Sequence, residues 1–444
     1  MADLMEDQKE AADNFEKWLN TTDETFGGLW ASAGYGKSWL AKHMIQEVII
    51  KNSNYVPVIT SMTNSATDVL ADFVGMPVTT LHSLMGWVPI ANKDTGEESL
   101  STPQMRDKKA EHILTMNSLV VVDEAGLMGH LELRLLTEEC KATGARVLFI
   151  GDHKQCFPVT RGDEKLCVPA YDATESYFNL YLPKRTDDDN TIYKLSVALR
   201  ETVGGAKWPK LVTALNKDKK TGVRVVDDIE EYAMAAFRAG VRDGDTSNIK
   251  VLAFTNNRCL TLNRKVRKNV MGLKDPTPIV GEIMVANTSV TQMDGEEVLI
   301  KNNQQVIVKS VEKTDSHGLP GAFIQYTDLE GVDIAGIVFV PASPQKLKDR
   351  LHTIASEAAE HRDEGRDEKA SSTWRTYYNL KEGCADVRYT YAMTVNKAQG
   401  VTLKHVLVDL YDIDQARDRE QKARLAYTAI TRATHYVTLE GLLK

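Results

Sequence analysis

The stretch Ala31–Ser38, ASAGYGKS, constrains the fold more than any other part of this sequence. It fits a looser form of the phosphate-binding pattern G-x-x-x-x-G-K-[ST], with alanine in place of the first glycine. In such a loop, backbone N–H groups and the N-terminus of the next helix converge on phosphate oxygens. The loop needs a strand before it and a helix after it, and the sequence predicts both, over Phe26–Ser32 and Ser38–Asn52. We therefore expect a P-loop nucleotide-binding domain.

Residues of this loop have separate expected roles. Lys37 would reach the β- and γ-phosphates, and Ser38 would bind Mg²⁺. Ala31 requires only backbone angles that suit a residue with a Cβ atom, so we predict reduced tolerance at this position rather than loss of binding. The backbone groups expected to approach the phosphates belong to Ala33, Gly34 and Gly36.

Short, continuous apolar runs alternate with amphipathic segments along much of the chain. Such runs are typical of a parallel sheet that is covered on both faces. The first set is Val56–Ser61, Ser118–Glu124 and Arg146–Asp152, and the second is Ile249–Thr255, Lys404–Leu410 and His435–Gly441. Two α/β domains of similar type are predicted.

Two insertions have a different pattern. Gly86–Gln104 contains hairpin-like runs around a Lys-Asp-Thr-Gly turn. Residues 278–342 are rich in short β-like runs and predict a small antiparallel barrel. Pro344–Tyr378 then has a helical, highly charged pattern, which we interpret as a solvated helix face.

Length and composition set broader bounds. The 444 residues are enough for two to four domains. No apolar run approaches the length of a membrane span, and the acidic N-terminus does not resemble a signal peptide. Five scattered cysteines predict a reduced, cytoplasmic protein without structural zinc. The net charge of −8 argues against a general nucleic-acid coat, so any nucleic-acid site must be a local groove on an acidic body.

Acidic and amide side chains end two of the predicted strands. Asp123 and Glu124 follow the run LVVV, and Asp152 and Gln155 follow FIG. Polar groups at the carboxyl ends of parallel strands face the ligand crevice. We expect Asp123 to bind Mg²⁺, Glu124 to orient and deprotonate the attacking water, and Gln155 to sense the γ-phosphate. The sequence thus predicts a site that hydrolyses a nucleotide with Mg²⁺.

The order of these and other motifs resembles that of the superfamily 1 helicases. It is most similar to the Dda-type helicases of T-even bacteriophages, in the 5′-to-3′ branch with the RecD-like enzymes. The resemblance spans nearly the whole chain. The motifs are DQKEAADNF, ASAGYGKS, TSMTNSA, TTLHSLMG, VVVDEAG, IGDHKQ, LPKR, AFTNN, TVNKAQGVT and AYTAITRA.

The resemblance implies an α/β fold with two RecA-like parallel-sheet domains. The first would comprise residues 1–85 and 105–182, and the second residues 183–277 and 386–444. Residues 86–104 would form a β-hairpin pin that splits the duplex. Residues 278–385 would form an SH3-like barrel with a charged helical extension.

The resemblance also adds residues to the nucleotide site. Gln8 resembles the glutamine that reads adenine. Arg185 and Arg432 resemble two arginines of the second RecA-like domain that reach the γ-phosphate, where a planar guanidinium stabilises transition-state charge. Gln399 and Gly400 are expected to shape their loop and face the nucleotide. The expected catalytic set is Lys37, Glu124, Gln155, Arg185 and Arg432.

Other motifs resemble contacts to single-stranded DNA, for which small hydroxyl and amide groups suit phosphate and sugar. The candidates are Thr63, Asn64, Thr80, His82, Thr394, Asn396, Lys397 and Thr402. Asn396 replaces an expected histidine, and Thr186 replaces a common glutamine. At the pin, Trp87 or Leu100 would stack on the last base pair, although either could equally be a core residue. Trp374 would dock onto the pin or be a buried structural residue.

The expected function is ATP-dependent, 5′-to-3′ unwinding of duplex DNA in phage replication or recombination. We expect a monomer in the host cytoplasm that binds single-stranded and tailed duplex DNA and has no membrane partner. An acidic surface permits a single-strand-binding protein as a further partner. Two alternatives remain open: an RNA helicase, and a non-enzymatic nucleic-acid clamp or recombination accessory with a degenerate ATP site.

Overall fold

The structure is a computed structural model whose described parts form two compact units. The first unit comprises Met1–Ile229, Leu252–Thr255 and Thr394–Lys444, and the second comprises Glu230–Val251 and Asn256–Met393. The structure describes residues 4–52, 54–91, 98–159, 165–182, 190–216, 221–287, 289–291, 298–302, 304–316, 318–329, 331–334 and 336–441.

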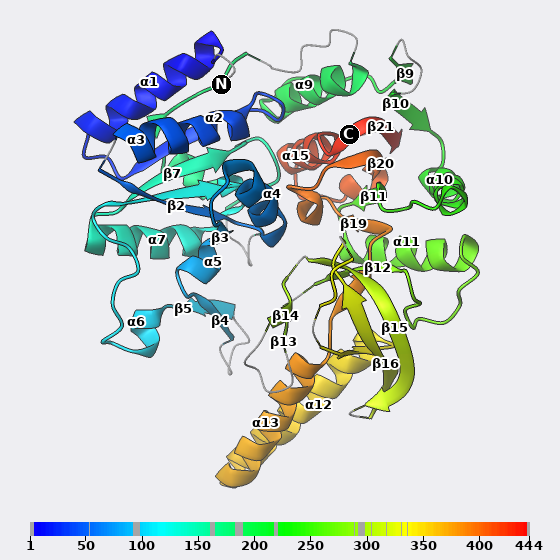
Figure 1. Ribbon diagram of the computed structural model, residues 1–444. Coiled ribbons are helices and arrows are strands. Elements are labelled where there is room, and N and C mark those ends of the chain that lie inside the picture. The colour runs from blue at the N-terminus through cyan, green and yellow to red at the C-terminus, as the bar shows by residue number, and fades with distance from the viewer. Residues whose placement is uncertain are drawn as a thin grey trace. The chain divides into compact units, whose positions relative to one another are not determined.

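The first unit contains a parallel sheet with the strand order β3-β2-β6-β7-β1-β8 (Figure 1). Each pairing between neighbours is parallel. The three apolar runs of the first predicted set form β2, β6 and β7, so that prediction is confirmed. The strands are β1 (Phe26–Trp30), β2 (Val56–Ser61), β3 (Thr79–Thr80), β6 (Ser118–Asp123), β7 (Arg146–Gly151) and β8 (Ser176–Tyr177).

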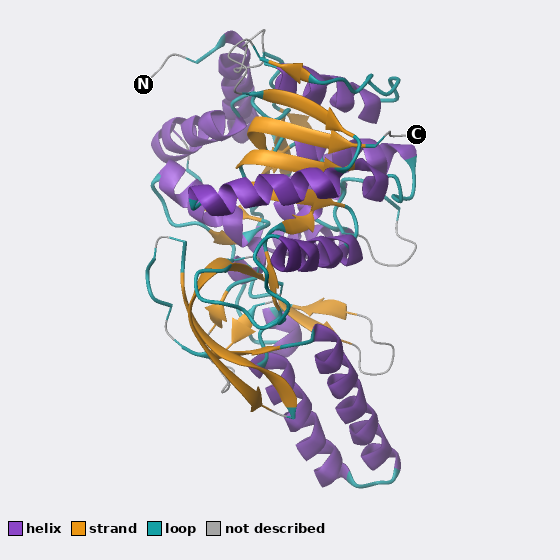
Figure 2. Cartoon of the chain, turned by 90° about the vertical axis from the view of Figure 1, so that its right-hand side faces the viewer, coloured by secondary structure: helices purple, strands orange, loops and turns teal. Residues whose placement is uncertain are grey.

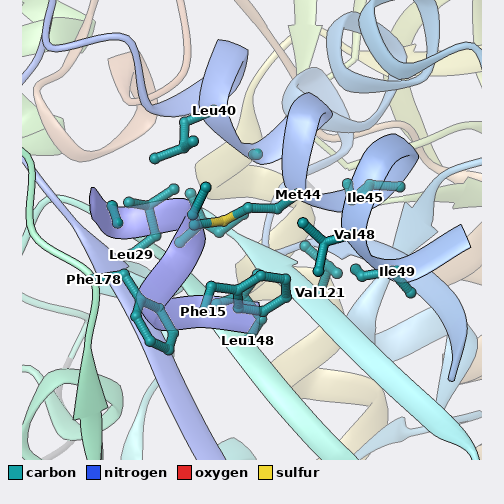
Figure 3. Packing of buried hydrophobic residues seen from close by; sticks show 14 of the residues in the cluster. Phe15, Leu29, Leu40, Met44, Ile45, Val48, Ile49, Val121, Leu148 and Phe178 are labelled. Carbon is teal, nitrogen blue, oxygen red and sulfur yellow. The ribbon is translucent and has the colours of Figure 1, made fainter. Parts of the chain in front are cut away.

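Apolar side chains cover both faces of this sheet. On one face, Phe15 of α1 and Met44 pack against Leu29, Val121 and Leu148 of the strands (Figure 3). The other face is covered by a second buried cluster that includes residues of α7. The helical elements are α1 (Glu6–Thr21), α2 (Lys37–His43), the π-helical turn η1 (Met44–Ile49), α3 (Ile50–Asn52), α4 (Asn64–Val74), α5 (Leu81–Leu84), the 3₁₀ turn η2 (Ala125–Leu127), α7 (His130–Thr143) and α8 (Pro169–Asp172).

Two glycines in β1 have a packing role. A Cβ atom on Gly27 would lie 2.9 Å from the Phe178 ring, and one on Gly28 would overlap the Trp30 indole. Glycine usually weakens a strand because it has no side chain to pack. Here large aromatic rings fill the space that side chains at these positions would occupy, which explains how FGGLW forms a buried strand.

The insertion at Gly86–Gln104 contains an antiparallel hairpin of β4 (Val88–Ala91) and β5 (Glu98–Ser101). The short helix α6 (Pro103–Arg106) follows it. The predicted hairpin is therefore confirmed. Its turn lies outside the described residues.

A second sheet has the strand order β19-β11-β20-β21-β10-β9. The second set of apolar runs forms β11, β20 and β21, as predicted. The chain passes between the two units after Ile229, after Val251 in β11, after Thr255 and after Met393 in β19. The strands are β9 (Ala214–Leu215), β10 (Gly222–Val226), β11 (Ile249–Ala253), β19 (Ala392–Thr394), β20 (Leu403–Asp409) and β21 (Ala433–Glu440). The associated helices are α9 (Thr191–Val203), α10 (Ile229–Asp243), α11 (Asn256–Asn269), the 3₁₀ turn η3 (Asn396–Ala398), α14 (Leu410–Ile413) and α15 (Arg419–Ile430).

The second unit contains an antiparallel β-structure with its own buried core, as the short β-like runs predicted. One sheet has the order β17-β16-β15-β12-β18, and β13 pairs with β14. The strands are β12 (Ile283–Ala286), β13 (Val290–Thr291), β14 (Val298–Ile300), β15 (Gln305–Ser316), β16 (Leu319–Thr327), β17 (Val338–Pro341) and β18 (Val387–Tyr389).

The charged segment that follows forms two helices, α12 (Pro344–Asp363) and α13 (Asp367–Gly383). They lie side by side and are joined near Gly365, whose φ of +73° suits a glycine (Figure 2). Their charged residues are largely exposed, which confirms the solvated-face interpretation. Trp374 packs edge-on against Tyr377 within α13. Among the helices that the structure describes, none is long and apolar enough to cross a membrane.

Candidate active site

The phosphate-binding loop begins where β1 ends and finishes at the first residue of α2. Gly34 and Gly36 have φ angles of +85° and +83°, which L-residues with side chains rarely adopt. Ala31 is buried, and its backbone does not lie in this region. The loop therefore has glycine at its two positive-φ positions, and Ala31 has backbone angles that suit a residue with a Cβ atom, as expected.

Lys37 is folded onto the loop itself. Its Nζ atom donates to the carbonyl oxygens of Ala31 at 2.8 Å and Ser32 at 3.0 Å. Burial lowers the pKa of Lys37, against the opposing effect of nearby carboxylates led by Asp152. The neighbouring Ser38 is exposed. Among the described residues, this half-buried ammonium donates to backbone carbonyls, and it can transfer these hydrogen bonds to phosphate oxygens.

Two carboxylates stand together at the end of β6. Burial, followed by the charge of Glu124, raises the pKa of Asp123 to about 7. Glu124 has φ of +53° and is the one non-glycine residue with positive φ in the described part of the chain. Strained backbone of this kind is concentrated at functional sites. Both carboxylates lie near enough to Lys37 to oppose the lowering of its pKa.

This donor set fits a magnesium ion. Mg²⁺ is usually held by one or two protein ligands together with substrate phosphates, and Ser38 and Asp123 supply that number. Paired buried carboxylates repel each other unless a cation or a proton lies between them. Within the described residues, no group of three or more His, Cys, Asp or Glu side chains is arranged to hold a metal ion.

Asp152 follows β7 and has three partners. Its carboxylate accepts hydrogen bonds from the Tyr427 hydroxyl at 2.7 Å and from the Lys154 N–H at 3.1 Å. Arg200 Nη1 lies 3.5 Å from the same carboxylate. Burial raises the pKa of Asp152, but the charges of Arg200 and Lys37 outweigh this effect and leave the pKa below its usual value. Asp152 is therefore an ionised group beside the phosphate loop.

Gln155 and Gln399 come together although they are far apart in sequence. Both are buried, and the Gln399 Nε2 donates to Gln155 Oε1 at 3.4 Å. The Gln399 Oε1 is buried without a hydrogen-bond partner among the described residues. The predicted γ-phosphate sensor thus touches the loop that carries several of the DNA-binding candidates.

One face of α15 is fastened to the loop after β7. Arg424 donates to the Gln155 carbonyl at 3.0 Å and also to the His153 carbonyl. The Cys156 N–H donates to Thr428 Oγ1 at 3.0 Å. The Tyr427 hydroxyl also accepts a long hydrogen bond, 3.4 Å, from the Ala33 N–H of the phosphate loop. The helix that ends in the predicted arginine motif therefore lies against both nucleotide-binding loops.

The sequence analysis predicted neither this face of α15 nor Arg200 as part of the site. The spacing of Arg424, Tyr427 and Thr428 matches one helical face, which was the available signal. The predicted residue, Arg432, instead donates to the Thr428 carbonyl at 3.2 Å and to Thr431 Oγ1 at 3.1 Å, at the end of its own helix.

The remaining nucleotide candidates lie apart from this cluster or outside the described residues. Gln8 is buried in α1, where its Oε1 accepts from the Met5 N–H at 3.2 Å. Its Nε2 has no partner among the described residues, so a buried amide donor is available. Gly400 has φ of +77°. Arg185 and Thr186 lie outside the described residues.

The first group of DNA-binding candidates lies at the carboxyl ends of β2 and β3. The hydroxyls of Thr63 and Thr80 cap α4 and α5 by accepting from the N–H groups of Ala66 at 3.3 Å and Ser83 at 3.2 Å. Asn64 begins α4. The half-buried His82 lies 3.5 Å from Glu132 and edge-on to Trp87. The two threonine hydroxyls are thus already used to start helices.

The second group surrounds η3. Thr394 Oγ1 accepts from the Lys397 N–H at 3.4 Å, and Thr402 is exposed. Asn396 lines a cavity of about 180 Å³ together with Phe254 and Arg424.

The two pin candidates require a correction. Trp87 and Leu100 are only 5% and 7% exposed and belong to the core cluster on one face of the first sheet. They lie at the base of the hairpin, where apolar side chains are excluded from water by α5 and α7. Neither can stack on a base pair from this position, so the core alternative is the one observed.

Known proteins agree with this architecture. Residues 3–210 match the model of the AAA domain, and residues 389–439 match the UvrD-like helicase C-terminal domain. The chain is 24% identical to the ATP-dependent DNA helicase dda of Enterobacteria phage T4, with 98% of each chain covered. The chain is thus similar over nearly its whole length to a DNA helicase of the Dda type, and two of its segments match helicase-related domain models. These similarities favour an ATP-driven enzyme over the non-enzymatic clamp that the sequence left open.

Solved structures support the fold of this chain. The Pif1 helicase from Candida albicans superposes with a TM-score of 0.52 at 16% identity, covering 100% of this chain and 95% of that one. The Pif1 helicase from Bacteroides in complex with ADP-AlF3 and ssDNA has the same TM-score at 14% identity, covering 99% and 92%. The predicted α/β fold with parallel-sheet P-loop domains is confirmed.

Proposed function

We propose that this DNA helicase moves 5′-to-3′ along single-stranded DNA and separates duplex strands, using ATP hydrolysed at the Lys37 loop. The observation that carries this proposal is the contact between Gln155 and Gln399. It joins the end of β7, beside the phosphate loop, to the segment that holds Thr394, Asn396 and Thr402. A change at the nucleotide therefore has a short route to the candidate DNA contacts.

In this proposal each residue of the nucleotide site has one task. Lys37 and the backbone of the glycine-rich loop bind the phosphates, and Ser38 and Asp123 hold Mg²⁺. The ion supplies positive charge that offsets the charge of the phosphates. Glu124 accepts a proton from the attacking water, and Gln155 orients that water. Gln8 reads the adenine, since its Nε2 is a buried donor in need of an acceptor.

Arg185 and Arg432 are proposed to neutralise charge on the γ-phosphate. Arg432 now bonds to oxygens of its own helix end, which are weak partners compared with phosphate. Binding of ATP would therefore favour a rearrangement of the α15 end. The equilibrium shifts because ATP has a higher affinity for one of two conformations.

DNA is the proposed partner because the relatives are DNA enzymes. The phage T4 relative is a DNA helicase, and the Bacteroides Pif1 structure contains ssDNA. We propose that the 86–104 hairpin acts as the pin, through the turn beyond β4 and β5, and that the 278–342 region is the SH3-like barrel. We further propose that the protein is a monomer in the cytoplasm of a phage-infected cell. It would serve replication or recombination and would act together with a single-strand-binding protein.

Tailed duplexes test this proposal directly. The protein is mixed with Mg-ATP and two partial duplexes, one with a 5′ single-stranded tail and the other with a 3′ tail. Strand separation only on the 5′-tailed DNA is expected. Separation only from the 3′ tail would reverse the polarity, and failure on both would remove the pin assignment. Stimulation of ATPase activity by single-stranded RNA above that by DNA would favour the RNA helicase alternative.

A further inference from the structure

Arg200 joins α9 to the phosphate loop. Asn190 caps this helix by accepting from the Tyr193 N–H at 3.0 Å, which fixes where the helix begins. Near the other end, the Arg200 side chain is 18% exposed, and its Nε donates to the Ser32 hydroxyl. Its Nη1 lies 3.5 Å from the Asp152 carboxylate. A helix outside the first sheet thus places a guanidinium inside the nucleotide site.

Two cations therefore meet at one residue of the loop. Lys37 donates to the Ser32 carbonyl at 3.0 Å, while Arg200 donates to the Ser32 hydroxyl. Like charges this close repel each other unless an anion lies near both. Asp152 is that anion in the present structure, since its carboxylate is buried next to both cations. The carboxylates of Asp123 and Glu124 also act on Lys37, so the feature that distinguishes Arg200 is its hydrogen bonding and not the net charge of the loop.

The Arg200 guanidinium has unused hydrogen-bonding capacity. Its Nη1 is buried and makes no hydrogen bond with the residues that the structure describes. Asp152, by contrast, also accepts from the Tyr427 hydroxyl, so it keeps a partner if Arg200 moves. A guanidinium forms paired hydrogen bonds to phosphate oxygens, which a carboxylate 3.5 Å away does not provide.

We propose that Arg200 senses the terminal phosphate of ATP. Without nucleotide it rests on Ser32 and Asp152; when a triphosphate is bound, its Nη atoms donate to the terminal phosphate oxygens, and α9 is held against the loop. ADP lacks that phosphate and leaves Arg200 on Ser32 and Asp152. The inference rests on the proposed phosphate site at Lys37 and adds a third arginine to Arg185 and Arg432.

The test compares two nucleotides in the full-length protein. Affinities for fluorescently labelled ADP and for the labelled non-hydrolysable triphosphate AMP-PNP are measured for the wild type, Arg200→Gln and Arg200→Lys. For Arg200→Gln, we expect triphosphate binding to weaken at least tenfold and ADP binding to change less than twofold. Arg200→Lys keeps the charge but loses the planar guanidinium. Its affinity for the triphosphate should therefore lie between those of the wild type and Arg200→Gln. Lys194→Ala, which removes an exposed cation from the same helix, is the matched control and should bind both like the wild type.

Equal losses for both nucleotides would show that Arg200 only supports the fold, and no loss for either would show that it has no role; both outcomes overturn the inference. Thermal unfolding shows whether each variant is folded. If Arg200→Gln is misfolded, the affinities of Arg200→Lys for the two nucleotides decide the test. Lys37→Ala is measured in parallel. Wild-type binding of both nucleotides by that variant would overturn the phosphate site itself, which separates this failure from failure of the Arg200 role.

Discussion

Glu124 shows how one residue can trade stability for chemistry. Its φ of +53° costs a residue with a Cβ atom free energy that glycine would not lose. We expect Glu124→Gly to stabilise the fold by on the order of 1 kcal/mol, after allowing for the extra chain entropy of glycine. The same change should reduce ATP hydrolysis at least about 100-fold, because the proposed general base is lost. Thermal unfolding and steady-state ATPase assays measure the two effects.

Glu124→Gln separates backbone strain from charge. Like Glu124→Gly, it removes the carboxylate beside Asp123, so ATP hydrolysis should be lost. It keeps a side chain at a position with left-handed backbone angles, so it should not show the gain in stability that comes from relief of strain. Hydrolysis at the wild-type rate by Glu124→Gln would contradict the base assignment. Equal stability changes in the two variants would show that charge, not strain, is responsible.

The buried side chain of Lys250 should make the free energy of unfolding depend on pH. It is 1% exposed in β11, and its Nζ donates to Thr390 Oγ1 at 3.0 Å. Burial lowers the pKa of Lys250 to about 7. Between pH 7 and the normal lysine pKa, the unfolded chain binds more protons than the folded chain, so the free energy of unfolding rises with pH. The gain from pH 7 to pH 9 should be on the order of 2 kcal/mol.

Lys250→Met keeps the apolar stem and removes the charge. It should therefore be more stable than the wild type at pH 7, and the difference should shrink toward pH 9. Urea unfolding at several pH values measures this. A difference between the two proteins that stays constant with pH would mean that Lys250 is not the titrating group.

At the scale of single residues, the sequence predicts which candidate residues share one edge of the sheet, but not the contacts that they make. Glu124 and Gln155 follow strands that are readable from apolar runs, and Lys37 belongs to a recognisable loop pattern, so their shared edge could be predicted. Arg200 and Tyr427 could not be predicted, because both come from distant helices and reach Asp152 only through folding. Trp87 could not be assigned either, since burial depends on how the hairpin base packs.

Among the elements, a buried ion pair fastens α11 to the start of the β-structure in the second unit. Arg267 donates to Glu282 at 2.8 and 3.1 Å, and both side chains are buried. Glu282 also accepts from the Ile279 N–H and the Tyr391 hydroxyl. Arg267→Met should cost about 3–5 kcal/mol in the free energy of unfolding, because it leaves Glu282 buried and unpaired. Urea denaturation of the full chain gives this value.

The double variant Arg267→Met with Glu282→Leu should lose less free energy of unfolding than the two single variants lose together, because neither buried charge of the pair remains. Lys309→Ala is the control, because the Lys309–Asp333 pair lies on the exposed surface of the same unit. Such a pair contributes at most about 1 kcal/mol. Strict additivity of the two buried changes would contradict the proposed coupling.

The elements themselves were mostly readable from the sequence. Apolar runs predicted β2, β6 and β7, because strands that are buried on both faces are continuously apolar. The turn pattern predicted the hairpin of β4 and β5, because turn chemistry is local in sequence. The glycines of β1 blurred its signal, because only the folded structure brings Phe178 and Trp18 over them. The π-helical turn at Met44–Ile49 carries no simple sequence signal.

For the molecule as a whole, the central question is how DNA binding reaches the ATP site. The Gln155–Gln399 contact is the most direct connection, because each glutamine belongs to a different functional segment. We expect Gln399→Ala to keep basal ATP hydrolysis within about threefold but to lose at least about tenfold of its stimulation by single-stranded DNA. The difference corresponds to a coupling free energy of roughly 1.4 kcal/mol or more.

Asn396→Ala provides the comparison for this prediction. It alters a candidate DNA contact in the same segment without touching Gln155, so it should weaken DNA affinity and leave maximal stimulation intact at saturating DNA. ATPase titrations with a single-stranded oligonucleotide resolve the two parameters for each variant. If Gln399→Ala changes only the DNA concentration for half-maximal activity, then Gln399 belongs to the DNA contact. Coupling must then travel through α15, where Arg424 and Thr428 hold the loop after β7.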